Sequence, residues 1–444
     1  MENQLNKRYG LFTAIAMVVG TVIGSGVFFK AETVLKSTGG NMPLGIVAWA
    51  LVGLIMIICS YTFAILAARF EKVNGIVDYA DVTVGQKYGY YVGWFMTTIY
   101  MPCITSVLAW VSARYTAVLL GWDITGGSAM TIACLFLVGS YTINALSPII
   151  AGKLQITTTV IKLIPLLLMA IIGTIVGINN GVAIENFTNV LDPNISTTDG
   201  LFASVVAVAF AYEGWIIATT INSELKDSKK NLPKALVLGS IIVVVVYIAY
   251  YIGLSGAIPT EMLMESGETG VMTAFQNIFG QIGGTLVFVF VIISCLGTLN
   301  GLMLGSTRGM YSIAARNRGP LPEVFKQVDK ATNMPTNSAI LGLFVTTLWL
   351  VYFYGANLTD TWFGVFSFDS SELPIITLYA AYIPIFVNMM KKGEDLNSFN
   401  RYIMPCLSIL SCVFMVIAAF IAHGQAVFYY LIVFAVIMLI GKLF

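Results

Sequence analysis

Long apolar runs recur from one end of the chain to the other, and they constrain the fold more than any other feature of the sequence. Each run approaches the roughly 20 residues that an α-helix needs to cross the hydrocarbon core of a bilayer. Apolar residues make up 58% of the 444 residues and charged residues only 10%, and no single water-soluble core could bury that much apolar surface. The sequence therefore predicts an all-α integral membrane protein that crosses the bilayer many times.

The apolar runs number twelve, and the loops between them divide the basic residues unequally. Of the 23 Lys and Arg residues, only Lys30, Lys36 and Arg114 fall on one side, while Lys162 falls inside a span and the rest lie on the other side. Because Lys and Arg collect in cytoplasmic loops, we expect a multi-pass protein of the plasma membrane with both termini in the cytoplasm. We place the spans at residues 10–38, 44–69, 89–120, 128–148, 153–178, 200–225, 235–258, 283–316, 337–355, 361–390, 402–422 and 426–443.

The first span is interrupted halfway along its length by Gly24, Ser25 and Gly26. At about 1.5 Å per helical residue, the apolar stretch 11–23 crosses roughly half of the ~30 Å hydrocarbon core, so the interruption lies near mid-membrane. Unpaired backbone groups persist at that depth only where they face protein or a water-filled cavity, and the N–H groups that open the second half-helix favour an anionic group. The pattern favours a binding site, with a glycine-rich helix contact as the structural alternative.

The sixth span repeats this interruption at residues 212–214, about twelve residues from its start. Since five spans separate the two interruptions, the first span enters the membrane from the cytoplasm and the sixth from outside, as an inverted repeat requires. We therefore predict a first repeat in residues 10–178, an inverted second repeat in residues 200–391 and two additional helices in residues 401–444. Corresponding interrupted helices in two halves mark the substrate site of a transporter.

Lys162 and three acidic residues fall inside predicted spans, where an ionisable side chain is costly unless it has a partner or a function. Lys162 lies near the midplane of the fifth span, where a bound sodium ion would otherwise bridge the first span to its neighbours. A structural lysine is the alternative, although its side chain is too short to reach either interface. Glu213 lies in the sixth-span interruption, where pairing with freed N–H groups is the alternative. Asp369 and Glu372 lie in the outer half of the tenth span, where both a substrate contact and a wet vestibule remain open.

Reactive side chains elsewhere in the sequence favour neither catalysis nor metal binding. The six cysteines lie inside apolar runs, where they behave as small hydrophobic residues, and their spacing matches no disulfide framework or zinc site. His423, the one histidine, lies at a predicted loop edge and is expected to be solvated. Because no nucleophile and base share a common depth, we expect no enzymatic activity, no cofactor, no metal and no nucleic-acid partner.

Three sequence motifs resemble those of a known family. Residues 20–28, GTVIGSGVF, resemble the first-helix signature of the amino acid-polyamine-organocation (APC) superfamily, and residues 210–215, FAYEGW, resemble its sixth-helix counterpart in the L-amino acid transporter (LAT) branch. Residues 224–235, ELKDSKKNLPKA, are similar to the charged loop that follows in that branch. The resemblance covers nearly the whole chain and implies twelve transmembrane helices in a LeuT-type 5+5 inverted repeat, with helices 1 and 6 discontinuous.

This resemblance implies a sodium-independent amino acid transporter, usually an exchanger, and we expect small neutral L-amino acids to be exchanged by alternating access. In the family the substrate carboxylate meets backbone N–H groups, which correspond here to those of Ser25 and Gly26. The substrate amino group meets carbonyls that correspond to Val22, Phe210 and Glu213. The expected substrate-binding residues are Val22, Ile23, Gly24, Ser25, Gly26, Phe210, Ala211, Tyr212 and Glu213.

Phe210 and Lys162 match two further positions of the branch, the aromatic gate over the substrate and the helix-five lysine, so we expect both to act in gating or coupling. Glu213 is larger than the Gly often found at its position, and Asp369 and Glu372 stand where relatives are mostly apolar. Charge selection by these three acids would make the chain a cationic amino acid or polyamine antiporter, which is the alternative function. An amino-acid-sensing membrane receptor is the alternative from another class.

The loop between the third and fourth helices reads GWDITGG and has no cysteine. Animal members of the branch bond to a heavy subunit through a cysteine in this loop. The expected partners are therefore a small amino acid substrate and the lipid bilayer, without a disulfide-linked heavy subunit. Residues 71–75, EKVNG, also lack the proline and Gly-Gly pair that are usual after helix two, so the cytoplasmic gating helix is expected to be set differently.

Overall fold

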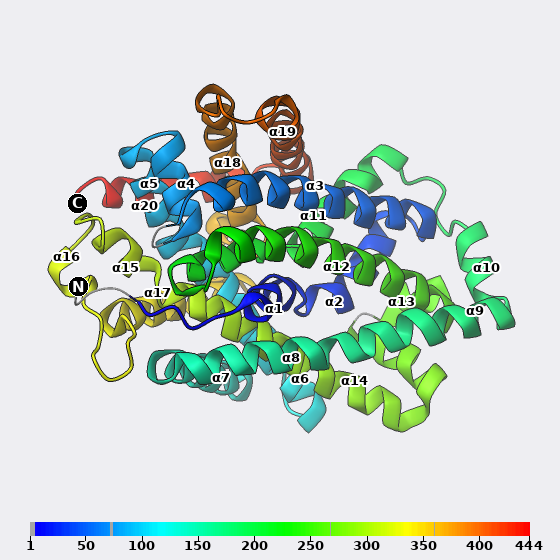
Figure 1. The fold of residues 1–444 in the computed structure, drawn as a ribbon. Coiled ribbons are helices and arrows are strands. Elements are labelled where there is room, and N and C mark those ends of the chain that lie inside the picture. Colours follow the sequence, from blue (N-terminus) through cyan, green and yellow to red (C-terminus); the bar gives the residue numbers. More distant parts are fainter. Residues whose placement is uncertain (1–4, 72–73, 267, 359) are drawn as a thin grey trace.

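The computed structural model describes residues 5–71, 74–266, 268–358 and 360–444, which form a bundle of helices (Figure 1). Lys72 and Val73, in the unusual loop after the second span, lie outside the described residues. Within the described ranges, the backbone forms helices and one isolated bridge between Tyr9 and Leu225, and it forms no β-strand. The all-helical prediction is therefore confirmed.

Each predicted span corresponds to one helix or to a series of consecutive helices. The first five correspond to α1 (Leu11–Val22) with α2 (Gly26–Ser37), α3 (Met42–Arg69), α5 (Gln86–Phe95) with η1 (Met96–Tyr100) and α6 (Met101–Leu120), α7 (Gly127–Leu146), and α8 (Pro148–Leu168) with η2 (Met169–Gly173) and α9 (Thr174–Asn180). The next five correspond to α11 (Thr197–Ala211) with η3 (Trp215–Glu224), α12 (Ser228–Ala257), α14 (Glu268–Ser306) with α15 (Gly309–Ala314), α17 (Thr336–Ala356), and α18 (Leu373–Lys392). The last two correspond to η5 (Phe399–Ile403) with α19 (Met404–His423), and to α20 (Ala426–Gly441). Short helices in the connections are α4 (Gly75–Thr83), α10 (Val182–Thr188), α13 (Thr260–Ser266), α16 (Pro322–Phe325) and η4 (Gly364–Phe366).

Ten continuous helical segments of the described chain are long and apolar enough to cross a membrane, and α1 and α2 together add a bent eleventh span. The twelfth predicted span corresponds to α20, which is apolar but only 16 residues long. Every predicted span therefore has a helix, while the number twelve stays a prediction. The described ends of the chain lie at the same end of the bundle, opposite α9 and α10 (Figure 1), which fits an even number of spans.

The tenth span starts twelve residues later than predicted. α18 begins only at Leu373, so Asp369 and Glu372 precede the helix and do not lie in its outer half as expected. The Asp369 carboxylate accepts hydrogen bonds from the backbone N–H groups of Ser371 at 2.7 Å and of Glu372 at 3.3 Å. Pro374 occupies the first turn of the helix. An acid that accepts from free N–H groups and an early proline are both typical of a helix start.

The two interrupted spans lie at the centre of the bundle. α1 packs against α8, α12, α14 and η3, and Figure 1 shows α1 and α2 between α12 and α8. α1 and α2 meet at a bend of 46°, and α11 and η3 are separated by the turn at residues 212–214. The predicted discontinuity of helices 1 and 6 is therefore confirmed. Any chemistry at the two interruptions is enclosed by other helices.

Candidate functional site

The interruption of the first span frees backbone carbonyl groups in the middle of the bundle. α1 ends at Val22, Ile23 is extended with φ −72° and ψ 91°, and α2 begins at Gly26. Carbonyls at the end of a helix have no partner within that helix and need one elsewhere. Side chains of α8, α12 and α14 supply these partners.

Lys162, on α8, is fully buried beside this interruption. Its ammonium group donates to the carbonyl oxygens of Gly20 at 2.8 Å and Ile23 at 2.6 Å, and to Oγ1 of Thr298 at 3.1 Å. Oγ1 of Thr298 in turn lies 3.0 Å and 2.9 Å from the same two carbonyl oxygens. An ammonium has three donors, so all three have an acceptor here, and Lys162 connects the end of α1 to α8 and α14.

Two more side chains bind the remaining carbonyls of this interruption. The Tyr247 hydroxyl, on α12, lies 3.0 Å from the carbonyl oxygens of Val22 and Ala211, so one side chain connects both interrupted spans. Ser294, on α14, donates to the carbonyl of Gly24 at 3.0 Å. The scaffold therefore already satisfies the carbonyls of the first interruption.

The backbone N–H groups of Gly24, Ser25 and Gly26 lie at the start of α2. A helix offers no internal acceptor to its opening N–H groups, and within the described residues none of these three donates a backbone hydrogen bond. The same three residues line a small central cavity. An anionic group in this cavity would meet free N–H donors and the positive end of the α2 dipole.

The second interruption packs directly against the first. α11 ends at Ala211, and the chain passes through Gly214, with φ 106°, into the tighter 3₁₀ helix η3. A Cβ on Gly214 would lie 2.8 Å from the Thr21 carbonyl oxygen, and a Cβ on Gly26 would lie 2.7 Å from Cα of Ala211. Glycine is needed at both positions because the two backbones touch there.

Glu213 is the acidic group of the second interruption. Its side chain is 5% exposed, it lines the central cavity, and its Oε1 accepts a hydrogen bond from the Tyr100 hydroxyl. Oε2 has no hydrogen-bond partner among the residues that the structure describes. A buried carboxylate oxygen without a donor is unfavourable, so this atom is suited to accept a hydrogen bond from a ligand.

The position of Tyr100 depends on a proline in the next turn. It ends η1, a five-residue π-helical turn, and Pro102 lies two residues further on. Pro102 has no N–H to donate to the carbonyl of Thr98, which instead accepts from the indole of Trp349 at 2.9 Å. Loss of a helical hydrogen bond at proline allows this wider turn, and the wider turn carries Tyr100 to Glu213.

The central cavity is small, about 20 Å³, which is room for about one water molecule. Three of the nine expected substrate-binding residues do not line it. Ile23 gives its carbonyl to Lys162, Ala211 packs on Gly26, and the ring of Tyr212 packs edge-on against that of Trp49. The expected residues that do line it are Val22, Gly24, Ser25, Gly26, Phe210 and Glu213.

Four residues that the sequence did not indicate complete the lining: Thr21, Ile104, Leu108 and Thr298. Ile104 and Leu108, on α6, form an apolar wall of the cavity. Thr298 is the hydroxyl that Lys162 binds. These residues lie in long apolar spans of ordinary composition, and nothing in the sequence around them distinguishes a residue that lines a cavity from one in the core.

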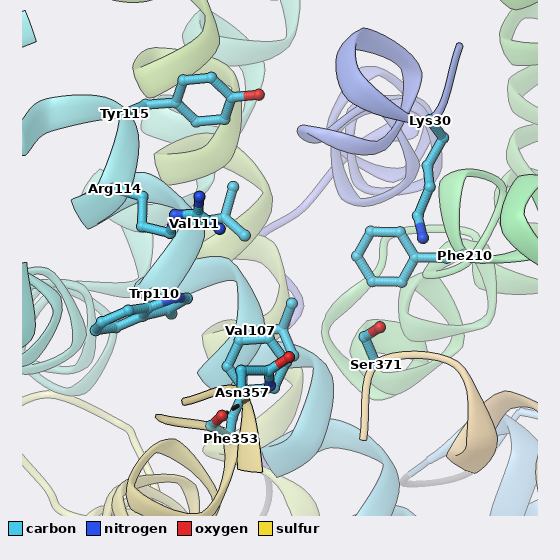
Figure 2. Close-up of a pocket in the computed structure, with 10 residues that line it drawn as sticks. All are labelled: Lys30, Val107, Trp110, Val111, Arg114, Tyr115, Phe210, Phe353, Asn357 and Ser371. Atoms are coloured by element: carbon cyan, nitrogen blue, oxygen red, sulfur yellow. Dashed lines mark hydrogen bonds between the residues drawn. The ribbon is translucent and has the colours of Figure 1, made fainter. Parts of the chain in front are cut away.

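Phe210 separates the central cavity from an outer cavity, on the side predicted to face outside. Phe210 belongs to the lining of both cavities, which is the place that a gate between them would occupy. The outer cavity is larger, about 140 Å³. Figure 2 shows its lining residues, which are Lys30, Val107, Trp110, Val111, Arg114, Tyr115, Phe210, Phe353, Asn357 and Ser371.

The acids at the start of α18 belong to this outer region. Nζ of Lys30 lies 2.6 Å from Oε1 of Glu372, and Oε2 of Glu372 lies 3.0 Å from Nε2 of His423. The sequence suggested that His423 is solvated, but the structure places it beside the Glu372 carboxylate. Asp369 and Glu372 are not among the described residues that line the central cavity, whereas Glu213 is.

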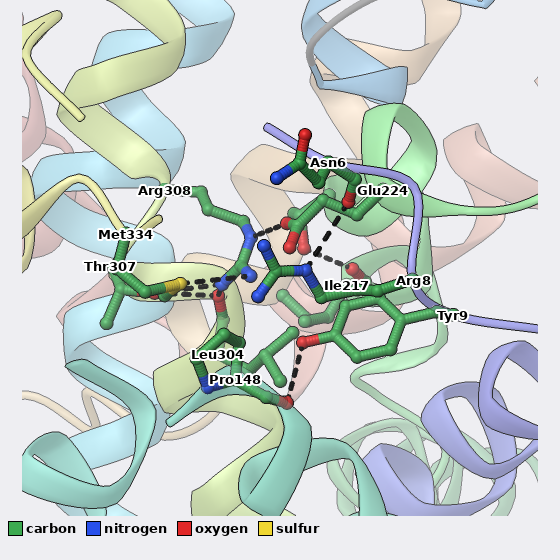
Figure 3. A network of polar contacts seen from close by, with 11 residues as sticks. Asn6, Arg8, Tyr9, Pro148, Ile217, Glu224, Leu304, Thr307, Arg308 and Met334 are labelled. Carbon is green, nitrogen blue, oxygen red and sulfur yellow. Dashed lines mark hydrogen bonds and ion pairs between the residues drawn. The ribbon is translucent and has the colours of Figure 1, made fainter. Parts of the chain in front are cut away.

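The opposite, predicted cytoplasmic side is closed by a buried ion pair. Arg308 and Glu224, which are 1% and 0% exposed, form this pair, and Arg308 also donates to Oγ1 of Thr307 at 3.0 Å. The backbone N–H groups of Arg8 and Tyr9 donate to the Glu224 carbonyl at 2.8 Å and 3.0 Å. Figure 3 shows the segment before α1 lying against this pair, so it covers the bundle at this end.

Comparisons with known proteins agree with this architecture. A sequence profile described as amino acid permease matches residues 9–441. The serine/threonine exchanger SteT of Bacillus subtilis is 29% identical over an alignment of 417 residues that covers 92% of this chain and 90% of SteT. The human large neutral amino acids transporter small subunit 2 is 28% identical over an alignment of 360 residues that covers 78% of this chain and 64% of that protein.

One solved structure shows the same fold. The crystal structure of MhsT in complex with L-phenylalanine superposes with a TM-score of 0.61 and covers 95% of this chain and 100% of that chain, at 15% sequence identity. The match confirms the LeuT-type fold. At this identity the likeness concerns the fold alone.

Proposed function

The chain belongs to the amino acid permease family, and on this premise we propose that it exchanges small neutral L-amino acids across a membrane by alternating access. The predicted resemblance to the LAT branch of the APC superfamily is confirmed by its relatives. The chain is a multi-span amino acid transporter and not an enzyme. SteT is an exchanger of serine and threonine by name, which favours small substrates for this chain.

One observation supports the proposal most strongly: the two walls of the central cavity are complementary to a zwitterion. The N–H groups of Ser25 and Gly26 offer donors to a carboxylate, and Glu213 offers an acceptor to an ammonium group. Val22 and Phe210 line the same cavity. Each of their carbonyl oxygens already accepts one hydrogen bond and has a second lone pair for the ammonium group. The substrate side chain would then face the apolar wall of α6, which suits a small neutral residue.

Exchange is expected to proceed without sodium. The Lys162 ammonium already lies against the carbonyls of Gly20 and Ile23, where a metal cation would otherwise find its oxygen ligands. A fixed positive charge at this point repels a second cation and offers it no oxygen without a donor. Lys162 would also tie the first interruption to the scaffold and thereby set the balance between outward- and inward-facing states.

The proposed cycle moves the interrupted spans relative to the others. We expect α1, α2, α11 and η3 to rock against a scaffold of α6, α7, α14 and α17, with two inverted repeats in residues 10–178 and 200–391 and additional helices in residues 401–444. The proposed location is the plasma membrane, with both termini in the cytoplasm. The protein is expected to work without a disulfide-linked heavy subunit.

Glu213 favours a second candidate function, the exchange of cationic amino acids. Its Oε2, without a partner among the described residues, is the acceptor that a second positive charge on the substrate would require at the central cavity. Asp369 and Glu372 lie beyond Phe210 and bind groups of their own, so charge selection in the central cavity would depend on Glu213 alone.

The decisive experiment is counterflow in liposomes that contain the purified protein. Vesicles loaded with unlabelled L-serine should accumulate external labelled L-serine, equally in sodium and choline buffers. Competition by L-alanine stronger than by L-arginine would support the neutral substrate class. Uptake that follows a sodium gradient, or binding without counterflow, would contradict the proposal, and the second result would indicate a sensor.

A further inference from the structure

We propose that His423 is a proton sensor that favours opening of the outer side when it is protonated, through the Glu372 carboxylate that it shares with Lys30. This inference rests on the proposed function, because it concerns the regulation of the alternating access that this function requires. The effector is the external proton, and the site is the cluster of charged side chains at the start of α18.

The members of this cluster come from three spans. His423 ends α19, Glu372 precedes α18 and Lys30 lies on α2. Oε2 of Glu372 lies 3.0 Å from Nε2 of His423, and its Oε1 lies 2.6 Å from Nζ of Lys30. The side chains of His423, Glu372 and Lys30 are only 17%, 10% and 12% exposed, so solvent ions screen them less than surface charges. One carboxylate therefore contacts two basic groups, of which only the imidazole changes its charge near neutral pH.

The other groups around the ring do not duplicate this change of charge. Among the described residues, three charged groups act on the ring: Glu372, Asp369 and Lys30. The helices α3, α11, α18 and α20 pack against α19, and Asp199, at the start of α11, is exposed and is not one of the three. Because the sequence has a single histidine, histidine titration in this protein belongs to His423 alone.

Lys30 is the member of the cluster that belongs to a moving span. It lies on α2, which packs against α11, the outer half of the other interrupted span. Glu372 and His423 belong to α18 and α19, which pack against each other and lie outside the spans proposed to rock. Nζ of Lys30 lies 5.4 Å from the centre of the Phe210 ring (Figure 2). The ion pair between Lys30 and Glu372 therefore joins a moving span to a stationary one directly beside the proposed gate.

The direction of the effect follows from the charges. While the ring is neutral, the pair of Lys30 and Glu372 holds α2 against the start of α18. Protonation of the ring places a second cation at the same carboxylate, so the imidazolium and Lys30 repel each other while α2 stays in place. This repulsion ends when Lys30 moves away with α2, whereas Glu372 and Asp369 remain beside the ring. Because linkage is reciprocal, proton binding favours the state in which the outer side is open.

The test measures the external KM for L-alanine in liposomes with one fixed protein orientation, as the external pH is lowered from about 7.5 to about 5.5, across the range in which histidine titrates. The external KM of the wild type should fall about threefold, the size of effect that partly exposed charge pairs produce, because a larger fraction of the protein is competent to bind from outside. The same change of the internal pH should leave the external KM unchanged.

Two variants separate the sensor from other effects of pH. His423→Gln keeps a polar side chain but cannot titrate, so its external KM should be the same at both pH values. Lys30→Gln keeps the histidine but removes the cation that the protonated ring repels, so it should lose the pH dependence as well. Lys36→Gln is the matched control. Lys36 is another basic residue of α2, but it pairs with Glu32 on its own helix, so this variant should keep the threefold dependence.

A wild-type KM that stays constant or rises on external acidification would overturn the proton sensor. A pH dependence that persists unchanged in His423→Gln or in Lys30→Gln would overturn it as well. If neither variant can be reconstituted, the wild type decides through the sign and the sidedness of its pH dependence. A wild-type protein that exchanges no amino acid at either pH contradicts the proposed function instead.

Discussion

The two interrupted spans differ in what they leave for a ligand. In the first, side chains of the scaffold already donate to the carbonyls, as at Gly20, Ile23 and Gly24, whereas the N–H groups of residues 24–26 have no backbone acceptor among the described residues. In the second, Glu213 keeps a carboxylate oxygen without a partner among the described residues. The first interruption therefore offers donors, which suit the carboxylate of an amino acid zwitterion. The second offers an acceptor, which suits its ammonium group.

The largest mutational effect is expected at the carbonyl groups of the first interruption, which Lys162 binds. Lys162→Ala should lower the exchange rate on the order of a hundredfold, because it removes the charged donor from two buried carbonyls, while substrate affinity changes much less. Lys162→Arg should restore little, since its planar fork is bulkier and donates in other directions. Exchange rates and equilibrium binding in liposomes and detergent measure the two effects.

The control for this prediction lies on the same helix. Lys153→Ala removes an exposed lysine of α8 and should leave exchange unchanged. Lys162→Ala protein that exchanges at the wild-type rate would show that the scaffold holds the first interruption without this ammonium.

The N–H donors of the first interruption are tested with ligands that lack a carboxylate. L-alaninamide and simple amines, which lack a carboxylate, should inhibit exchange about thirtyfold more weakly than L-alanine, since charge-assisted hydrogen bonds contribute about 1.5–3 kcal/mol each. Inhibition constants against labelled L-serine measure this difference. Equal inhibition by the amide and the amino acid would mean that the N–H groups of Ser25 and Gly26 do not hold the carboxylate.

The acceptor side is tested by Glu213→Gln, which keeps the size of the side chain and removes its charge. Affinity for neutral amino acids should fall about tenfold through loss of a charged acceptor for the ammonium group. Tyr100→Phe, which removes the donor to Oε1 but keeps the charge, should have a smaller effect. If the wild type prefers L-arginine and Glu213→Gln abolishes that preference, the cationic alternative is correct.

The acids outside both interruptions should matter least. Asp369 and Glu372 do not line the central cavity, so Asp369→Asn and Glu372→Gln are each expected to change the exchange rate within about fivefold, as a net loss of about 1 kcal/mol for one hydrogen bond implies. The preference among neutral and cationic amino acids should stay the same. A change of preference in competition assays would show that selection by charge occurs before the central cavity.

The spans, the two interruptions and the depth of Lys162 could all be predicted from the sequence. Each depends on a short stretch of chain: an apolar run long enough to cross a bilayer, glycines that release the backbone within that run, and a charge counted from its end. The start of α18 was misplaced because residues 361–368, four of which are aromatic, are apolar enough to continue the pattern. The turn at Asp369 and the proline in the first turn, Pro374, mark the actual start.

Only the tertiary structure decided which groups meet. Lys162 and Ile23 are 139 residues apart in sequence, Arg308 and Glu224 are 84 apart, and Lys30 and Glu372 are 342 apart. The local sequence does not identify the residues that bind these carbonyls, Tyr247, Ser294 and Thr298, or those that form the apolar wall on α6. In an apolar span, the sequence around a hydroxyl or a leucine is the same whether the side chain faces a cavity, lipid or the core. Local patterns determine where a helix runs and where it stops, but a hydrogen bond between spans depends on how those helices pack and turn against one another.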